Sequence, residues 1–235
     1  MKEKKINIDP LKHTLDNLDI AKKNIYLGVD FFSLTKHLKI KNYNFLEATE
    51  YILNYIKKIL GNDGNIIIPV FNFDCVAQKK FHKIYSDGQS GAFGNILLKK
   101  YFNLRTYHPM YSFLCFGKNF DNYKKKRNKN ATGKNSLWKN FIDEDYDLIS
   151  IGHHWNRSFT HVHYIENLVD VNYRFDLNFV LNYFESDKKS ASKKFSFFAR
   201  KREICEFSGI TFKCDKLFMK EKISKFYKYK NLISF

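Results

Sequence analysis

The chain has 235 residues, a hydrophobic fraction of 44% and a formal net charge of +17. This length and composition favour one large globular domain over residues 1–235 and exclude a disordered chain. The positive charge favours anionic partners, but no zinc-finger spacing, basic heptad helix or RNA-recognition signature accompanies it, so we do not expect nucleic acid as the partner.

The residues from 24 to 73 predict a strand, a helix and a second strand joined by short turns. A buried strand is expected over 24–31. The apolar spacing over 44–60 is helical, and "GNDG" follows it as a stop signal. The β-branched run over 65–73 predicts the second strand. Strand, helix and strand with short joints indicate a parallel α/β sheet.

Apolar runs further along predict a helix over 94–102, a strand over 111–118, a helix over 136–142 and a strand over 146–152. We then expect an irregular, β-leaning region with a polar loop over 185–194, and a basic terminal helix over 217–235. The predicted fold class is α/β: a mixed, mainly parallel central sheet flanked by helices in an α/β/α sandwich, with an irregular β-rich C-terminal region.

The four cysteines lie at positions 75, 115, 205 and 214, with spacings that suit neither a zinc site nor a disulfide scaffold. Reduced thiols in a cytoplasmic protein are therefore expected. No apolar run approaches the roughly 20 residues of a membrane span, and the N-terminal segment lacks the apolar region of a signal peptide.

The stretch "THVHYIE", residues 160–166, follows a predicted strand that ends at Gly152. Ligand sites of open α/β sheets gather at such strand ends. We expect Thr160 to be the N-cap of a helix on which His163 and Glu166, three residues apart, share one face. A carboxylate beside an imidazole fixes its tautomer and raises its basicity, which suits a general base.

Two other interpretations of this stretch stay open. His161 and His163, with His153 and His154 nearby, could ligate a metal, although no further carboxylate or cysteine is positioned to complete the set. The polar residues could also simply surround a helix start. A nucleophilic triad is less favoured, because no Gly-x-Ser-x-Gly elbow occurs and no cysteine has a basic setting.

A second cluster, "RTYHPMYSF", spans residues 105–113. Pro109 forces His108 out of helical geometry, so the segment is a constrained loop. Taken alone, His108 is more typical of a hydrogen-bonded structural residue than of a catalyst.

The order of these segments resembles the aminoglycoside 3-N-acetyltransferase family, in the branch tied to surface-polysaccharide synthesis. The resemblance covers residues 24–203 and rests on an ordered set of motifs, each weak alone: "GNIIIPVFNF" (64–73), "RTYHPMYSF" (105–113), "GKNSLW" (133–138), "ISIGHHWNRSFTHVHYIE" (149–166), and "VNYRFD" (171–176) with "FFARKRE" (197–203). The glycine and aromatics of "CEFSGITFKCDKLF" (205–218) also fit.

The resemblance implies transfer of an acetyl or other short acyl group from acetyl-CoA to the amine of an amino sugar, without a metal. It assigns catalysis to His163 as base, Glu166 as the carboxylate that orients it, and Thr160 as support for that loop or for the thioester carbonyl. The implied substrate-binding residues are His108, Tyr173, Arg174 and Asp74. The implied residues for coenzyme A are Ser33, Arg105, Ser112 and Ser136.

Departures from the family pattern bear on the substrate. Where the family has V-H-S-S-L, this chain has "VDFFSL" (29–34), and Leu137 replaces a proline. A chain of charge +17 attracts a cationic antibiotic poorly, so a nucleotide-linked or glycan-biosynthetic amino sugar is the favoured acceptor. The alternatives are an aminoglycoside acetyltransferase that confers antibiotic resistance and an inactive binding module. The oligomeric state stays open, with a homodimer as the assembly considered.

Overall fold

A mixed sheet forms the centre of the molecule in the computed structural model, which describes residues 5–21, 23–203, 220–221, 227–229 and 232–234. Within these residues the sheet has six strands in the order β4-β2-β1-β5-β9-β8. β1 is parallel to β2 and β5, whereas β4 and β9 are antiparallel to their neighbours. The strands are β1 (Asn24–Val29), β2 (Asn65–Pro69), β4 (Phe113–Phe116), β5 (Tyr146–Ile151), β8 (Tyr227–Tyr229) and β9 (Leu232–Ser234).

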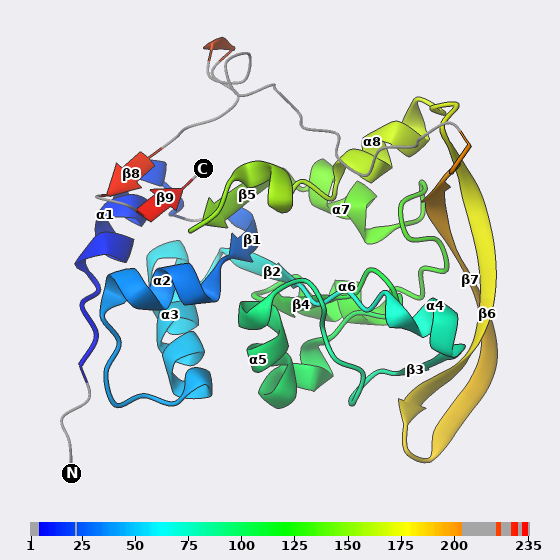
Figure 1. Ribbon diagram of the computed structural model, residues 1–235, viewed down its shortest axis with the longest axis horizontal. Helices are drawn as coiled ribbons and strands as arrows, with labels where there is room; N and C mark the ends of the chain where they lie inside the picture. The colour runs from blue at the N-terminus through cyan, green and yellow to red at the C-terminus, as the bar shows by residue number, and fades with distance from the viewer. Residues whose placement is uncertain (1–4, 22, 204–219, 222–226, 230–231, 235) are drawn as a thin grey trace.

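Helices cover both faces of this sheet (Figure 1). The apolar side chains of one face pack on α1 (Asp9–Leu18), α2 (Phe31–Leu38), α3 (Phe45–Leu60) and α5 (Ala92–Tyr101). Those of the other face pack on α6 (Phe120–Lys125), α7 (Leu137–Asp143) and α8 (Val162–Leu168).

Alternation along the central strands produces the two cores. In β1, Ile25 and Leu27 point into the first core and Tyr26 into the second. In β2, Ile66 belongs to the first core and Ile67 to the second. Successive strand side chains point to opposite faces, so an almost continuously apolar strand is buried on both sides. The predicted α/β/α arrangement of a mixed sheet is confirmed.

α3 illustrates how local sequence sets an element. The side chain of Asn44 accepts from the backbone N–H of Glu47 at 2.9 Å, and the Glu47 carboxylate accepts from the N–H of Asn44 at 3.3 Å. This capping box satisfies two N–H groups that the first turn leaves unpaired. Gly61 ends the helix with a φ of 72°. The structure thus confirms the helix predicted over 44–60.

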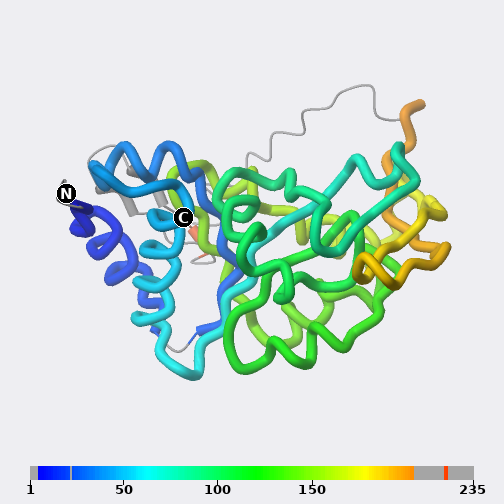
Figure 2. Tube along the Cα trace, turned by 90° about the horizontal axis from the view of Figure 1, so that it is seen from below, coloured from blue at the N-terminus to red at the C-terminus, as the bar shows by residue number. Residues whose placement is uncertain are grey.

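A second sheet has the order β3-β6-β7, from β3 (Lys80–His82), β6 (Arg174–Ser186) and β7 (Lys189–Arg200). The β6–β7 hairpin forms a long curved wall at the end of the molecule opposite α1 (Figures 1 and 2). Leu181, Tyr183 and Phe195 of the hairpin belong to a third apolar cluster that also includes Cys75 and Tyr107. The polar run over 185–194 is therefore hairpin strand and turn rather than the predicted loop, and the region is more regular than expected.

The short elements that connect these layers are α4 (Asp74–Gln78) and the 3-10 turns η1 (Phe102–Leu104) and η2 (Trp155–Arg157). Near the C-terminus, residues 227–229 and 232–234 pair as antiparallel strands, so the expected terminal helix is wrong there. The motif over 205–218 and the cysteines 205 and 214 lie outside the described residues, whereas Cys75 and Cys115 are buried free thiols. Within the described residues, no helix is both long and apolar enough to cross a membrane.

Candidate active site

His163 and Glu166 lie on one face of α8, as their spacing predicts. Nδ1 of His163 is 2.7 Å from Oε2 of Glu166, and the hydroxyl of Tyr173 donates to Oε1 at 2.8 Å. The His163 side chain is 24% exposed and that of Glu166 8%. Because Nδ1 faces the carboxylate, Nε2 is the nitrogen with which the imidazole can meet a substrate.

Arg174 holds the same carboxylate from the first position of β6. Its Nε lies 2.7 Å from Oε2 of Glu166, and its Nη1 donates to the carbonyl of Phe198 at 3.0 Å. Burial acts to raise the pKa of Glu166, but hydrogen bonds from His163 and Tyr173 and the charges of His163 and Arg174 hold that pKa below its usual range. Glu166 therefore stays ionised and can orient the imidazole and stabilise its protonated form.

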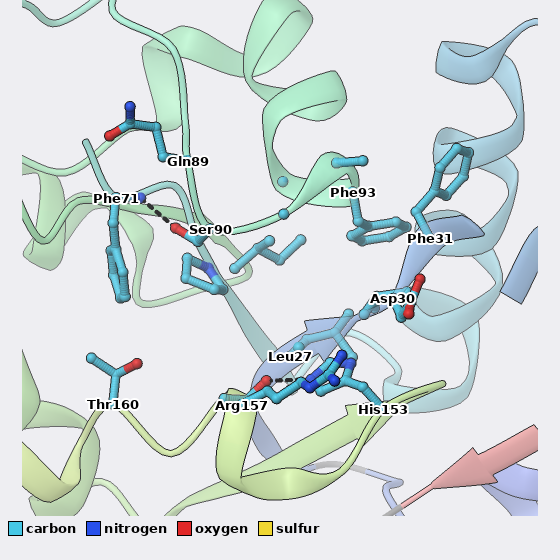
Figure 3. A pocket seen from close by; sticks show the side chains of 18 of the residues that line it. Leu27, Asp30, Phe31, Phe71, Gln89, Ser90, Phe93, His153, Arg157 and Thr160 are labelled. Carbon is cyan, nitrogen blue, oxygen red and sulfur yellow. Dashed lines mark hydrogen bonds between the residues drawn. The ribbon is translucent and has the colours of Figure 1, made fainter. Parts of the chain in front are cut away.

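A cavity of about 500 Å³ lies at the carboxyl ends of β1 and β2 (Figure 3). Its wall comprises the ends of these strands, the first residues of α2 and α5, and a loop that runs from His153 to Thr160. Figure 3 shows Phe71, Gln89 and Ser90 on one side of this space and His153 and Arg157 on the other. This is the strand-end position at which open α/β sheets bind ligands.

Thr160 lies on the cavity wall, three residues before His163 in the chain. His161, not Thr160, is the N-cap of α8, and no side chain caps that helix, so the predicted capping role is wrong. The hydroxyl of Thr160 is instead hydrogen-bonded to that of Tyr26, and both residues line the cavity. His163 lies three positions beyond Thr160 and is not itself among the cavity-lining residues.

Tyr111 makes a second connection between the pair and the cavity. Its ring lies 4.8 Å from that of Phe71, edge to face, and Phe71 lines the cavity. Burial raises the pKa of Tyr111 to about 12, and the charges of Arg174 and Glu166 also act on this hydroxyl. Tyr111 therefore contacts the cavity-lining Phe71 and is close enough to Arg174 and Glu166 for their charges to act on its hydroxyl.

Arg105 and Ser112 form an internal brace. Arg105 is fully buried, and its Nε donates to Oγ of Ser112 at 2.9 Å. Its Nη2 donates to the carbonyl of Val70 at 3.0 Å, its Nη1 donates to the carbonyl of Ser86, and Ser112 donates to Val70 at 2.9 Å. Neither residue lines the cavity. This arrangement supports β2 and β4 and leaves the guanidinium no free edge for a phosphate.

His108 is also buried, with 0% exposure. Its Nδ1 accepts from the N–H of Tyr111 at 3.1 Å, and its Nε2 lies 3.3 Å from the carbonyl of Ser196. Burial lowers the pKa of His108 to about 3, so the ring is neutral. Both nitrogens bind main chain, so the ring joins the loop before β4 to the hairpin.

The remaining predicted residues differ in position. In α2, the N–H of Ser33 donates to Asp30 at 3.0 Å, and Asp30 lines the cavity. Asp74 accepts from Nε2 of Gln89, another cavity residue, at 2.7 Å. Ser136 is fully buried, and its hydroxyl has no hydrogen-bond partner within the described part of the chain. Ser33 and Asp74 therefore adjoin the cavity, whereas Ser136 belongs to the interior.

Sequence reasoning missed two parts of the cavity wall. One is the start of α5, where Gly91 has a φ of 117° and no side chain caps the helix. The small residues of "SGAFG" (90–94) could have indicated this close backbone approach. The other is the contact between His153 and Ser158, whose atoms lie 2.7 Å apart. Both residues line the cavity, but the sequence offered His153 only as a candidate metal ligand.

Histidine clustering does not produce a metal site in the described residues, where no group of three or more His, Cys, Asp or Glu could hold an ion. His161 packs its ring 4.1 Å from Phe159, and burial lowers its pKa to about 4. The ring therefore serves as a neutral packing group beside α8.

The family model described as aminoglycoside 3-N-acetyltransferase matches residues 37–225, which is most of the chain. The chain therefore belongs to this family. Family membership makes it an N-acetyltransferase. The surface-polysaccharide branch is not distinguished by this match. A comparison with curated protein sequences finds no match.

Solved structures share the fold at low sequence identity. The YokD protein from Bacillus subtilis has a TM-score of 0.68 and 12% identity, with 97% of this chain and 92% of that chain covered. Sisomicin-bound AAC-VIa has a TM-score of 0.68 and 13% identity, with coverage of 97% and 91%. AAC-IIIb in a binary complex with CoASH has a TM-score of 0.69 and 12% identity, with coverage of 95% and 89%.

Proposed function

We propose that the chain transfers the acetyl group of acetyl-CoA to an amine of an aminoglycoside or a similar amino sugar, with His163 as general base. The observation that carries this proposal is the 2.7 Å contact between His163 and Glu166, next to Thr160 on the wall of a cavity of about 500 Å³. Membership of the family supplies the reaction class.

The cavity wall fits a narrow thioester arm followed by phosphates. A Cβ at Gly91 would meet nothing nearer than the carbonyl of Val29 at 4.0 Å, so the backbone there borders open space. Phe31, Phe32 and Phe93 supply apolar wall, and the exposed Arg157 supplies a cation at the same cavity. We assign the acyl arm to the start of α5 and the phosphates to Arg157. Ser33 does not line the cavity itself, but its N–H donates to Asp30, which does.

The proposed roles of the residues follow from the proton that the attacking amine must lose. Bound acetyl-CoA supplies an acyl group activated as a thioester. An amine attacks only as the neutral base, so Nε2 of His163 removes its proton while Glu166 holds Nδ1. We assign Tyr173 and Arg174 as positioning residues that hold Glu166, because both contact its carboxylate rather than the cavity.

The acceptor assignment follows the family description and the local charge at the cavity rather than the net charge. Asp30 lines the cavity and Asp74 is hydrogen-bonded to Gln89 on its wall. Two carboxylates near one opening favour an acceptor with several ammonium groups. The sisomicin complex of AAC-VIa is compatible with this preference but describes that protein.

A second acceptor class is an anionic, nucleotide-linked amino sugar, as the sequence analysis favours. The observations behind it are the net charge of +17 and the position of Arg157 at the cavity. Electrostatic attraction of such a substrate would be weakened by salt. Its acetylation would place the chain in glycan synthesis.

The test measures acetylation of sisomicin and of a nucleotide-linked amino sugar by wild type, His163→Ala and the control His13→Ala on the exposed side of α1. We expect His163→Ala to lose about 10²–10⁴-fold in rate while the control keeps the wild-type rate. A His163→Ala variant as active as wild type would refute the base assignment. The faster acceptor at physiological salt decides between the two substrate classes.

A further inference from the structure

His153 and Ser158 form a pair that the transfer reaction described above does not use. Nε2 of His153 lies 2.7 Å from Oγ of Ser158. Figure 3 shows His153 beside Arg157 at the cavity. Both side chains line the cavity. A serine hydroxyl within hydrogen-bond reach of an imidazole is the arrangement that activates a nucleophile.

The fold fixes both partners. The carbonyl of Ile151 accepts a hydrogen bond from the ring of His153, which leaves Nε2 to face the serine. Gly152, with a φ of 81°, turns the chain between these two residues. A nucleophile whose base is oriented by a third group has the pattern of a hydrolytic triad, here with a backbone carbonyl in the third position.

Ser158 lies directly over the backbone of β1. A Cβ added at Gly28 would come within 2.0 Å of Oγ of Ser158 and 3.3 Å of Nε2 of His153. Only glycine at this position leaves room for the pair. Ser158 is 6% exposed, so its hydroxyl is held in a restricted space rather than free at the surface.

The imidazole is suited to accept a proton. Burial lowers the pKa of His153, against the opposing effect of the Asp30 charge, so the neutral form prevails. A neutral ring with Nδ1 or Nε2 committed to a carbonyl has its other nitrogen free to accept from a hydroxyl. The 2.7 Å contact therefore has the hydroxyl of Ser158 as donor and Nε2 as acceptor.

We propose that Ser158, with His153 as its base, is a second catalytic centre that hydrolyses acyl thioesters or esters in this cavity when no amine is bound. The assignment of acyl-CoA as its natural substrate rests on the proposed function. The nucleophile itself rests only on the geometry of the pair.

The reaction has two balanced steps. Oγ of Ser158 attacks the acyl carbon as its proton moves to His153, the C–S bond breaks, and the imidazolium returns that proton to the departing thiolate. Water then attacks the serine ester, gives one proton to His153, and the acid is released as the serine regains its hydrogen. The products are acetate and the free thiol, and water is the co-reactant.

The start of α5 can assist this reaction across the cavity. Gly91 and Ala92 line the cavity, and no side chain caps the ten-residue helix. The first backbone N–H groups of a helix lack partners within it and attract negative charge. An acyl oxygen bound at the start of α5 would therefore be stabilised as it becomes negative.

The competing explanation is that Ser158 merely satisfies a buried imidazole. The probe that separates the two is 4-nitrophenyl acetate, an ester whose reaction does not require a coenzyme A site. We expect wild type to release nitrophenolate and to carry one acetyl group on the peptide that contains Ser158. Ser158→Ala and His153→Gln should each lower the rate by at least about 10²-fold.

Matched variants keep this test interpretable. Ser192→Ala changes an exposed serine of β7 and should keep the wild-type rate. Ser158→Cys retains a nucleophile and should still form a covalent acetyl adduct. Thermal unfolding of every variant identifies a loss of fold. Hydrolysis that is unchanged in folded Ser158→Ala, or an adduct only on another residue, would overturn the proposal.

The two proposals fail in different ways. Acetyl-CoA without an amine is expected to yield free thiol, measured with a thiol reagent, and this yield should fall in Ser158→Ala. Thiol release equal in wild type and Ser158→Ala, together with normal amine acetylation, would remove the second centre and leave the transferase intact. Ser158-dependent cleavage of the nitrophenyl ester without any amine acetylation would remove the transferase assignment and leave the nucleophile.

Discussion

Nε of Arg174 lies 2.7 Å from Oε2 of Glu166, and this ion pair joins α8 to the first residue of β6. The pair connects the candidate base to the hairpin that forms one end of the molecule. Oε2 of Glu166 also contacts Nδ1 of His163, so the hairpin helps to determine the position of the imidazole. The stability of the fold and the orientation of the base therefore depend on the same carboxylate.

Removing the carboxylate of Glu166 should lower the free energy of unfolding. Glu166→Ala leaves the charge of Arg174 buried without its partner, and we expect a loss of about 3–5 kcal/mol in the free energy of unfolding. Urea denaturation measures it. The control is Asp143→Ala, which breaks an exposed i,i+4 pair with Lys139 and should leave stability unchanged. Equal effects of the two substitutions would contradict the structural role of Glu166.

Acid should destabilise the protein through Glu166. Its pKa in the folded state is lowered, so the unfolded state takes up its proton first as the pH falls. The stabilisation is present above the ordinary glutamate pKa and is lost as the pH falls through the folded value. Denaturation midpoints between about pH 3 and pH 7 should fall less steeply for Glu166→Gln than for wild type. Parallel curves would exclude this contribution.

Substitution of Arg105 should lower the stability of the protein, whereas substitution of Arg157 should weaken the binding of acetyl-CoA. Arg105→Lys cannot reproduce the guanidinium fork and leaves the carbonyl of Ser86 unpaired, which should cost about 1–3 kcal/mol of stability. Arg157→Ala removes an exposed cavity residue and should raise the KM for acetyl-CoA roughly 10-fold, equivalent to about 1.4 kcal/mol, with Tm unchanged. Unfolding scans and initial rates test both. A reversed pattern would restore Arg105 as the cofactor residue.

Gly28 and Ser158 should be energetically coupled. Gly28→Ala brings a Cβ within 2.0 Å of Oγ of Ser158, and overpacking of this kind costs about 1–3 kcal/mol. Ser158→Gly removes the side chain that the new methyl meets, so the double variant should recover part of the loss. A double-mutant cycle should show coupling of about 0.5–3 kcal/mol. Additive effects would mean that the methyl is accommodated elsewhere.

Local patterns predicted the central elements well. The helix over 44–60 begins with a capping box between Asn44 and Glu47 and ends at Gly61, so all three signals lie within the segment or directly after it. The alternation of β1 and β2 likewise requires only their own residues. The same local logic brought His163 and Glu166 into contact, because a spacing of three places side chains together on any helix.

Patterns failed where partners are distant in sequence. The polar run over 185–194 has the composition of a loop, yet cross-strand pairs such as Leu181 with Lys193 place it in a hairpin. Strand pairing is non-local, so a polar segment can be strand when its partner supplies the hydrogen bonds. The terminal strands over 227–229 and 232–234 were missed for the same reason.

The sequence by itself determined the α/β class, the His163–Glu166 pair and the family to which the chain belongs, because these depend on short-range periodicity and on the order of motifs. Only the tertiary structure decided which polar residues face the cavity. Arg105 and His108 became internal supports, while His153, Ser158 and the start of α5 became cavity wall. The physical reason is that burial and hydrogen-bond partners are set by the packing of segments far apart along the chain, which no local pattern encodes.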